Sequence, residues 1–210
     1  MSGLTIKARG QKMRVTAETK ATTRKKILEA AGKLFGEIGF QATTTREIAV
    51  AAGIATGTLF NYFQTKEAII ACLASEAGSA ALLQFQVSPQ ESESLEEDLF
   101  SLLATGLRKL KSLRKHLPSL LETSLSPLSS DAEGDDVSFR VEHLAAVEAV
   151  ARARGFGEIS SVALQLYWTL YTGILLFWAN DKSPKQEDTL ALVDHSLTMF
   201  VGWLRDQTQL

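Results

Sequence analysis

The stretch TTREIAVAAGIATGTLFNYFQTK, residues 44–66, decides how the N-terminal part of this 210-residue chain is expected to fold. Thr44 followed three residues later by Glu47 is a capping box, in which each side chain satisfies a backbone N–H group at the start of a helix. Gly53 should end that helix, because glycine adopts the left-handed backbone of a helix stop without steric cost. The sequence therefore predicts one short helix between Thr44 and Gly53.

A second short helix is predicted directly after this stop. Leu59 and Phe63 lie four positions apart and share one helical face, whereas Thr58, Asn61 and Tyr62 fall on the opposite face. Two short helices joined by a glycine-containing turn form a helix-turn-helix. Small hydrogen-bonding side chains on its second helix suit the major groove of DNA.

An amphipathic helix should precede and support these two. Thr22 or Thr23 is expected to cap it and Gly39 to end it. Its apolar residues recur at helical spacing: Ile27, Ala31, Leu34, Phe35 and Ile38. Residues 1–20 are basic with little apolar content, so we expect a flexible basic arm. Such an arm is either a solvated tail or an additional contact for DNA phosphate or the minor groove.

Roughly residues 23–70 resemble the tetracycline-repressor (TetR/AcrR-like) family of bacterial transcription regulators. The resemblance is carried by Thr44–Ala49 (TTREIA), Ala52–Ile54 (AGI) and Gly57–Phe63 (GTLFNYF), closed by Lys66 and Glu67. It implies an all-α protein with a three-helix DNA-binding head and a helical body that binds a ligand and dimerises. It also implies a regulator, expected here to be a repressor, which a small molecule releases from double-stranded operator DNA.

The resemblance further implies which residues meet DNA. The positions that match base-reading residues are Arg46, Thr56, Gly57, Thr58, Asn61 and Tyr62, and those that match phosphate-holding residues are Thr44, Thr45 and Lys66. The chemistry agrees, because arginine binds guanine bidentately, asparagine suits adenine and a threonine methyl contacts thymine. Two positions depart from the family pattern: Ala55 stands where a capping Ser or Thr is frequent, and Phe60 where a phosphate-binding Tyr is frequent.

Charge is divided unevenly along the chain. The net charge is −2, but residues 1–66 hold 11 Lys and Arg against 4 Glu, and residues 67–210 hold 11 against 20 acids. A basic head on an acidic body is typical of a DNA-binding protein. We therefore expect a basic arm at 1–20, a helix-turn-helix domain at 21–66 and a ligand-binding and dimerisation domain at 67–210. Cys72 is the only cysteine and the N-terminal residues lack the apolar run of a signal peptide, which favours a cytoplasmic protein.

The body is expected to be helical, giving about nine helices in all. Helical spacing and the positions of the prolines predict helices at 66–86, 92–116, 118–126, 137–154, 159–180 and 186–207. Residues 159–180 carry no charge and approach the length of a transmembrane helix. We favour a helix buried between a core and a partner subunit, and we expect no membrane partner.

The last two helices each carry two apolar stripes, although a helix needs only one to cover its own core. A homodimer would bury the second stripe in a four-helix interface, and its two-fold symmetry predicts a near-palindromic operator. The residues assigned to that interface are Leu166, Leu170, Ile174, Phe177, Leu190, Leu197, Val201 and Leu204.

An effector pocket is expected among apolar and aromatic residues of the body, because ligand pockets are usually apolar with a few polar groups. The candidates are Phe100, Leu103, Leu107, Leu121, Phe139, His143, Tyr167, Trp168 and Tyr171. Few of these are charged, so we expect a mostly apolar or aromatic effector. Each of them could equally be an ordinary core residue.

The motifs of common enzymes are missing from the sequence. The residues three before His116, His143 and His195 are Leu113, Arg140 and Leu192, so there is no Glu-x-x-His pair for a di-iron bundle. A Walker loop and a Gly-x-Ser-x-Gly elbow are also absent. We expect no enzymatic activity, no metal and no cofactor. The alternative from another class is a helical membrane-surface or adaptor protein whose basic head binds acidic lipid.

Overall fold

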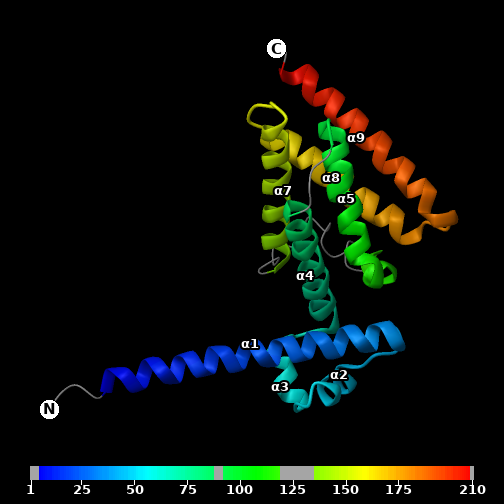
Figure 1. The fold of residues 1–210 in the computed structure, drawn as a ribbon. Helices are drawn as coiled ribbons and strands as arrows, with labels where there is room; N and C mark the ends of the chain where they lie inside the picture. Colours follow the sequence, from blue (N-terminus) through cyan, green and yellow to red (C-terminus); the bar gives the residue numbers. More distant parts are fainter. Residues whose placement is uncertain (1–4, 88–91, 119–134, 209–210) are drawn as a thin grey trace. The chain divides into compact units, whose positions relative to one another are not determined.

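The computed structural model describes residues 5–87, 92–118 and 135–208. Within these residues the chain folds into eight α-helices and two short 3-10 helices, with no strand. Figure 1 shows how the labelled helices follow one another along the chain. The predicted all-α fold is confirmed. The chain divides into two compact units, Met1–Leu73 and Ala74–Leu210. Their border lies inside a helix, whereas the sequence pattern suggests a border before residue 67.

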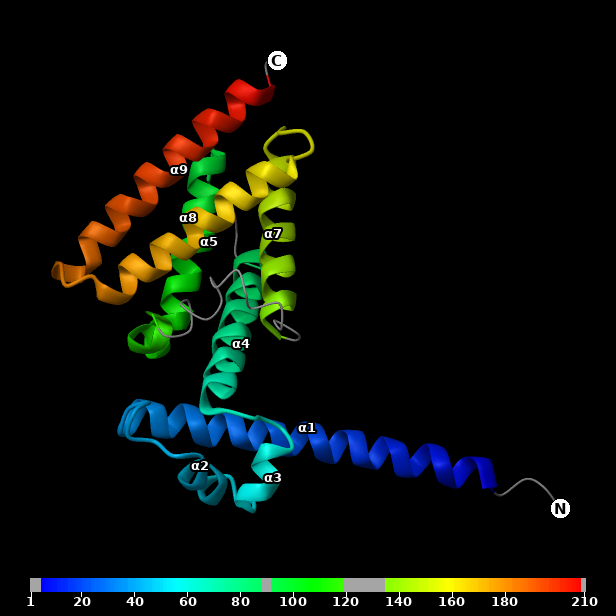
Figure 2. The ribbon, with the colours of Figure 1, turned by 180° about the vertical axis from the view of Figure 1, so that it is seen from behind.

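The first unit contains α1 (Thr5–Glu37), α2 (Thr45–Ala51), α3 (Thr56–Phe60) and the first two turns of α4 (Lys66–Val87). The short helices α2 and α3 lie together on one side of the long helix α1 (Figures 1 and 2). Their shared core consists of fully buried apolar side chains: Ile27, Ala31, Ile48, Ala49 and Leu59. Each large side chain in such a core contributes about 1.5–3 kcal/mol by leaving water.

The start of α1 differs from the prediction. The helix begins at Thr5, so neither Thr22 nor Thr23 caps it. Instead their hydroxyls donate to the carbonyl oxygens of Glu18 and Thr19, each at 2.9 Å, one turn back along the same helix. A threonine inside a helix makes this bond in place of a cap, and no proline precedes it to stop the helix. The predicted stop at Gly39 is confirmed by its positive φ of 87°.

The second unit contains the rest of α4, α5 (Leu95–Leu110), η1 (Lys111–His116), α7 (Asp135–Ala153), α8 (Ser161–Asn180), η2 (Pro184–Gln186) and α9 (Glu187–Thr208). The predicted helices at 137–154, 159–180 and 186–207 correspond to α7, α8 and α9. The predicted helix at 92–116 becomes α5 followed by the tighter η1. The predicted helix at 118–126 lies almost entirely outside the described residues.

Large buried side chains and one buried ion pair hold the second unit together. Tyr167 and Trp178 on α8 and Phe200 on α9 are each at most 2% exposed, and α9 packs against both α5 and α8. α7 and α5 are linked by an ion pair: Nε of Arg154, the residue after α7, donates to the carboxylate of Asp98 on α5 at 2.5 Å. Asp98 is buried, so this pair matches a charge that would otherwise be costly to bury.

Two helices, α4 and α8, are long and apolar enough to cross a membrane by length and composition alone. In α8 one face is buried inside its own unit through Tyr167, Tyr171 and Trp178, whereas the other face leaves Leu166 and Phe177 about two-fifths exposed. One side of α8 therefore belongs to the core of the second unit, and the other side presents apolar side chains at its surface.

Candidate functional site

The predicted capping box starts α2. The backbone N–H of Thr44 donates to Oε2 of Glu47 at 2.8 Å, and the backbone N–H of Glu47 donates to Oγ1 of Thr44 at 3.2 Å. The bond from the Thr44 backbone, followed by the bond of 2.8 Å that the Thr44 hydroxyl donates to the same carboxylate, holds the pKa of Glu47 below its usual range. The carboxylate therefore remains charged at the N-terminus of α2, where it also interacts favourably with the positive end of the helix dipole.

The turn that follows α2 sets the start of the second helix. Gly53 has a φ of 69°, which only glycine adopts easily, and the chain then enters α3 at Thr56. Ala55 occupies the cap position and makes no side-chain cap bond, as its departure from the family pattern implied. The fully buried Leu59 fixes α3 on the core of the first unit.

The residues predicted to contact DNA lie at the start of α2 and along α3. Thr44, Arg46, Gly57 and Asn61 are exposed, and Thr45, Thr56, Thr58 and Tyr62 are half-buried. α3 is shorter than predicted and ends at Phe60. Asn61 and Tyr62 therefore lie in the turn after the helix rather than on its face.

The side chain of Lys66, predicted to hold a DNA phosphate, is bound within the first unit. Its ammonium donates to the carbonyl oxygens of Phe40 at 2.6 Å and Thr43 at 2.8 Å, and lies 4.4 Å from the centre of the Phe40 ring. Two of the three donors of the ammonium are thus used inside the first unit. Sequence spacing carries no signal for these bonds, because their partners lie more than 20 positions earlier in the chain.

Five of the predicted pocket residues come together in one aromatic cluster between α7 and α8. Its members are Phe139, His143, Tyr167, Trp168 and Tyr171. The His143 ring lies 4.5 Å from that of Tyr171 and stacks on that of Tyr167 at 5.7 Å. Phe139 packs against His143 at 5.5 Å, and Trp168 against Tyr171 at 5.1 Å. Offset and tilted ring pairs at these distances are favourable beyond the area that they bury.

The cluster is polar in one place but carries no charge of its own. Nε2 of His143 and the hydroxyl of Tyr167 form a hydrogen bond of 3.1 Å. Burial lowers the pKa of His143 from 6.5 to about 4, and burial raises the pKa values of Tyr167 and Tyr171. All three side chains are therefore neutral near pH 7.

Two contacts around this cluster had no signal in the sequence. Phe200 on α9 extends it through Tyr167, with ring centres 5.6 Å apart. At the other end, the Phe139 ring lies against the backbone of α4 at Gly78. The remaining pocket candidates on α5 behave as core: Leu103 and Leu107 are buried and Phe100 is half-buried. Leu121 lies outside the described residues.

The residues assigned to a dimer interface separate into two groups. Ile174, Leu197, Val201 and Leu204 are at most 7% exposed within the single chain. They cover the core of their own unit. Leu166, Phe177 and Leu190 remain about two-fifths exposed, and Leu170 is half-buried. On α9, Met199 is also exposed, at 70%, on the side of the helix about 180° from Leu190.

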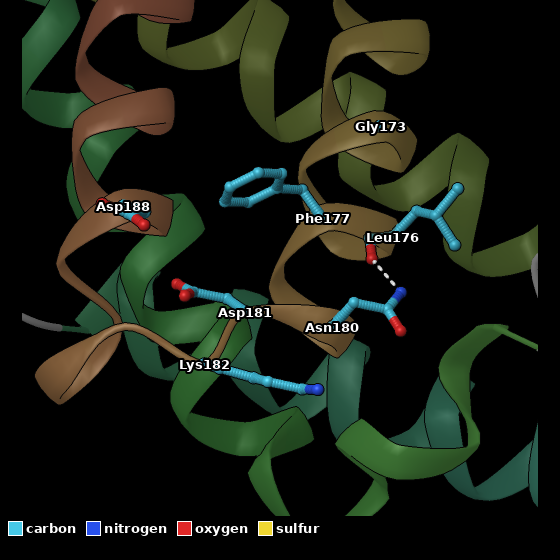
Figure 3. A pocket seen from close by; sticks show the side chains of 7 residues that line it. All are labelled: Gly173, Leu176, Phe177, Asn180, Asp181, Lys182 and Asp188. Atoms are coloured by element: carbon cyan, nitrogen blue, oxygen red, sulfur yellow. Dashed lines mark hydrogen bonds between the residues drawn. The ribbon is translucent and has the colours of Figure 1, made fainter.

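A depression lies where α8 meets the turn to α9 (Figure 3). Leu176 and Phe177 form its apolar side, and Asp181 and Lys182 form its polar side. The amide of Asn180 donates back to the Leu176 carbonyl at 3.0 Å, as the dashed line in Figure 3 shows. None of the predicted pocket residues lines it, so this depression is distinct from the aromatic cluster.

A basic N-terminal unit with a capped helix, a glycine turn and a second short helix defines a helix-turn-helix protein. Residues 27–73 match the family described as bacterial regulatory proteins, tetR family. The head of the chain thus has the N-terminal domain of this family, whose members are regulators rather than enzymes.

The curated relatives match over part of the chain. The HTH-type transcriptional repressor KstR2 of Rhodococcus jostii (strain RHA1) is 45% identical over 51 residues, which are 24% of this chain and 25% of that protein. The HTH-type transcriptional repressor Rv1474c of Mycobacterium tuberculosis is 29% identical over 105 residues, 48% of this chain and 56% of that protein. The chain thus spans between a quarter and just over half of the length of these two relatives.

Solved structures match over both units. A TetR transcriptional regulator from Rhodococcus sp. RHA1 has a TM-score of 0.68 at 19% identity, covering 87% of this chain and 97% of that chain. FadR of Thermus thermophilus, a TetR-family repressor solved with lauroyl-CoA, has a TM-score of 0.63 at 22% identity, covering 85% and 93%. At these identities the likeness shows the fold.

Proposed function

We propose that this protein is a ligand-responsive transcriptional repressor that acts in the cytoplasm and binds a near-palindromic operator as a homodimer. The single observation that carries the proposal is the capped helix-turn-helix, which leaves Arg46 and Asn61 exposed on a basic unit. Arg46 offers a bidentate donor for guanine, and Asn61 offers the amide that suits adenine. Thr44 and Thr45 at the start of α2 are proposed to hold phosphate, and Thr56, Gly57, Thr58 and Tyr62 to approach the bases.

In vitro selection tests this DNA-binding role and defines the operator sequence at the same time. The full-length protein is used to enrich duplexes from a random library, and the affinity for the selected duplex is compared with that for a scrambled one. We expect enrichment of two related half-sites in inverted order. Arg46→Ala should cost about 1–3 kcal/mol and relax the base preference at one position of each half-site. Equal affinity of the wild type for selected and scrambled duplexes would refute the proposal.

The proposed dimer uses the outer faces of α8 and α9. Leu166 and Phe177 on α8 lie on one helical side, and Leu190 and Met199 add exposed apolar surface from α9. Exposed apolar side chains that share one helical side, as Leu166 and Phe177 do, often mark an interaction site. Two copies related by a two-fold axis would bury the same face on each protomer, which is also the symmetry that a near-palindromic operator needs.

The proposed effector site is the aromatic cluster around His143. A ligand that enters between Phe139 and Trp168 replaces the contact between these two rings by contacts to itself. It can form a hydrogen bond with His143 or Tyr167, which bind each other in its absence. Because Phe139 also lies against Gly78, such a ligand acts directly on α4. α4 continues into the first unit, where it begins at Lys66. The effector then weakens operator binding, and by linkage it binds the DNA-bound dimer less tightly by the same factor.

A thermal-shift screen of neutral aromatic and apolar compounds tests this effector class. A fatty acyl thioester forms a second arm, because the Thermus thermophilus neighbour was solved with lauroyl-CoA. Each hit is then titrated into the complex with the selected duplex. We expect hits to lower operator affinity and to lose binding in His143→Phe. Hits that bind but leave operator affinity unchanged would refute the coupling and leave the DNA-binding role intact.

The alternative role at a membrane surface is favoured by one observation, the apolar character of α4 and α8. Co-sedimentation with vesicles that contain anionic lipid separates the two roles. Binding to vesicles together with failure to enrich any duplex would favour the membrane role.

A further inference from the structure

Lys66 is the first residue of α4, and its side chain binds the segment that leads into α2. Its ammonium is held in one place, because it donates to two carbonyl oxygens at once, those of Phe40 and Thr43. Thr43 is 1% exposed and directly precedes Thr44, the cap of α2. The lysine therefore fixes the backbone at the last position before the helix-turn-helix begins.

The surroundings of the ammonium argue against a simple phosphate contact. Two of its donors point at carbonyls, and the Phe40 ring lies 4.4 Å away as a cation–π partner. Only the third donor is left for a phosphate, unless the ammonium withdraws from these partners and leaves the carbonyl of the buried Thr43 without its charged donor. The same segment is also held by Thr43, whose N–H and hydroxyl both donate to the Gly39 carbonyl at 3.1 and 2.8 Å. The segment is thus a compact turn closed by Lys66.

We infer that Lys66 is a positioning residue through which the start of α4 sets the place of the α2 N-terminus, rather than a contact for DNA phosphate. Only the effect of Lys66 on operator affinity rests on the proposed DNA-binding function; its positioning of α2 does not. A displacement of the first turn of α4 is transmitted by one side chain to Thr44, Thr45 and Arg46. Lys66 therefore acts on operator affinity through the residues that α2 presents.

Hydrogen exchange of the full-length protein tests the positioning directly. Lys66→Met keeps the aliphatic stem and removes the donors, whereas Lys66→Arg keeps charge and donors. In Lys66→Met we expect the amides of residues 44–48 to exchange about tenfold faster, while those of α3 change little. Lys66→Arg should restore part of the protection. Unchanged exchange at 44–48 in Lys66→Met would overturn the inference.

The salt dependence of DNA binding separates positioning from a phosphate contact. Removing a side chain that neutralises a phosphate lowers the slope of log affinity against log salt concentration by about 0.9 per phosphate. For Lys66→Met we expect weaker binding to the selected duplex with the slope of the wild type. A slope reduced by about 1.8 for the two protomers would overturn the inference in favour of phosphate binding.

A second variant covers the case in which Lys66→Met does not fold. Phe40→Leu removes the ring beneath the ammonium and keeps both carbonyls, so the same faster exchange at 44–48 is expected to a smaller extent. Normal exchange there would overturn the inference. Should the wild type enrich no duplex at all, the proposed function fails, but the exchange measurements still decide the role of Lys66.

Discussion

The ring of Phe139 on α7 lies directly against the backbone of α4 at Gly78. A methyl group at position 78 would fall 2.7 Å from Cζ and 2.8 Å from Cδ2 of that ring, so only glycine allows this approach without movement. The hydroxyl of Ser79 adds a hydrogen bond of 2.8 Å to Glu142 one turn along α7. The aromatic cluster is therefore in direct contact with the one helix that belongs to both units.

Gly78→Ala should displace the Phe139 ring. We expect a loss of about 1–3 kcal/mol from overpacking, offset in part by the better helix propensity of alanine. Urea denaturation measures the net loss, and near-ultraviolet circular dichroism reports the moved aromatic rings. Gly106→Ala on α5 is the matched control, because its methyl group would meet no atom within 4 Å. Equal behaviour of the two variants would contradict the close approach.

The stability of the second unit should depend on pH through His143. Below pH 6.5 the unfolded chain binds a proton at this residue, but the folded chain does so only near its lowered pKa of about 4. The unfolding free energy therefore falls as pH falls through this window, by at most about 1.4 kcal/mol per pH unit. Denaturation between pH 7 and 4 measures the slope. His143→Phe should lose this component while keeping the slope due to other groups.

Thr44→Ala should weaken the start of α2. It removes the acceptor for the Glu47 N–H and the hydroxyl that donates to the Glu47 carboxylate, while the backbone N–H of residue 44 still donates to that carboxylate, at an expected cost of about 1 kcal/mol. Thermal unfolding followed by circular dichroism measures it. Thr45→Ala, one position inside the helix, should cost clearly less, and an equal loss in both variants would argue against the capping box as the cause.

A charge on the outer face of α8 should prevent dimer formation. Leu166→Glu and Phe177→Glu place a carboxylate on side chains that are already 40% and 44% exposed, so the fold of each chain should survive. Analytical ultracentrifugation at micromolar concentration should then give the mass of a monomer. Val141→Glu on α7 is the control at another exposed apolar position and should leave the mass of the wild type unchanged. A dimeric mass in both α8 variants would refute the proposed interface.

Local signals in the sequence were enough for the head and for most helices. The capping box at Thr44, the glycine stops at Gly39 and Gly53, and the helical spacing of the body all depend on residues a few positions apart. The start of α1 was missed because a threonine forms either a cap or a bond back into a helix, and only the conformation of the preceding residues decides between them.

Interactions between distant positions could not be predicted in this way. Helical spacing shows that α9 has two apolar stripes, but it does not say which stripe covers the core of its own unit; the structure places Leu197 in that core. The bond from Lys66 to Phe40 and the approach of Phe139 to Gly78 depend on tertiary packing. The pocket candidates were chosen from the sequence for their apolar and aromatic character, which does not show that those of α7 and α8 pack together.

The border between the two units falls between Leu73 and Ala74, inside the uninterrupted helix α4. A chimera that joins this body to the head of another family member must therefore preserve helical phase at the junction. Each residue inserted into or removed from α4 rotates everything beyond it by about 100° and shifts it by about 1.5 Å. Exchange of heads by simple substitution in register should give responsive hybrids, whereas a flexible linker at the same place should give two working modules that no longer communicate.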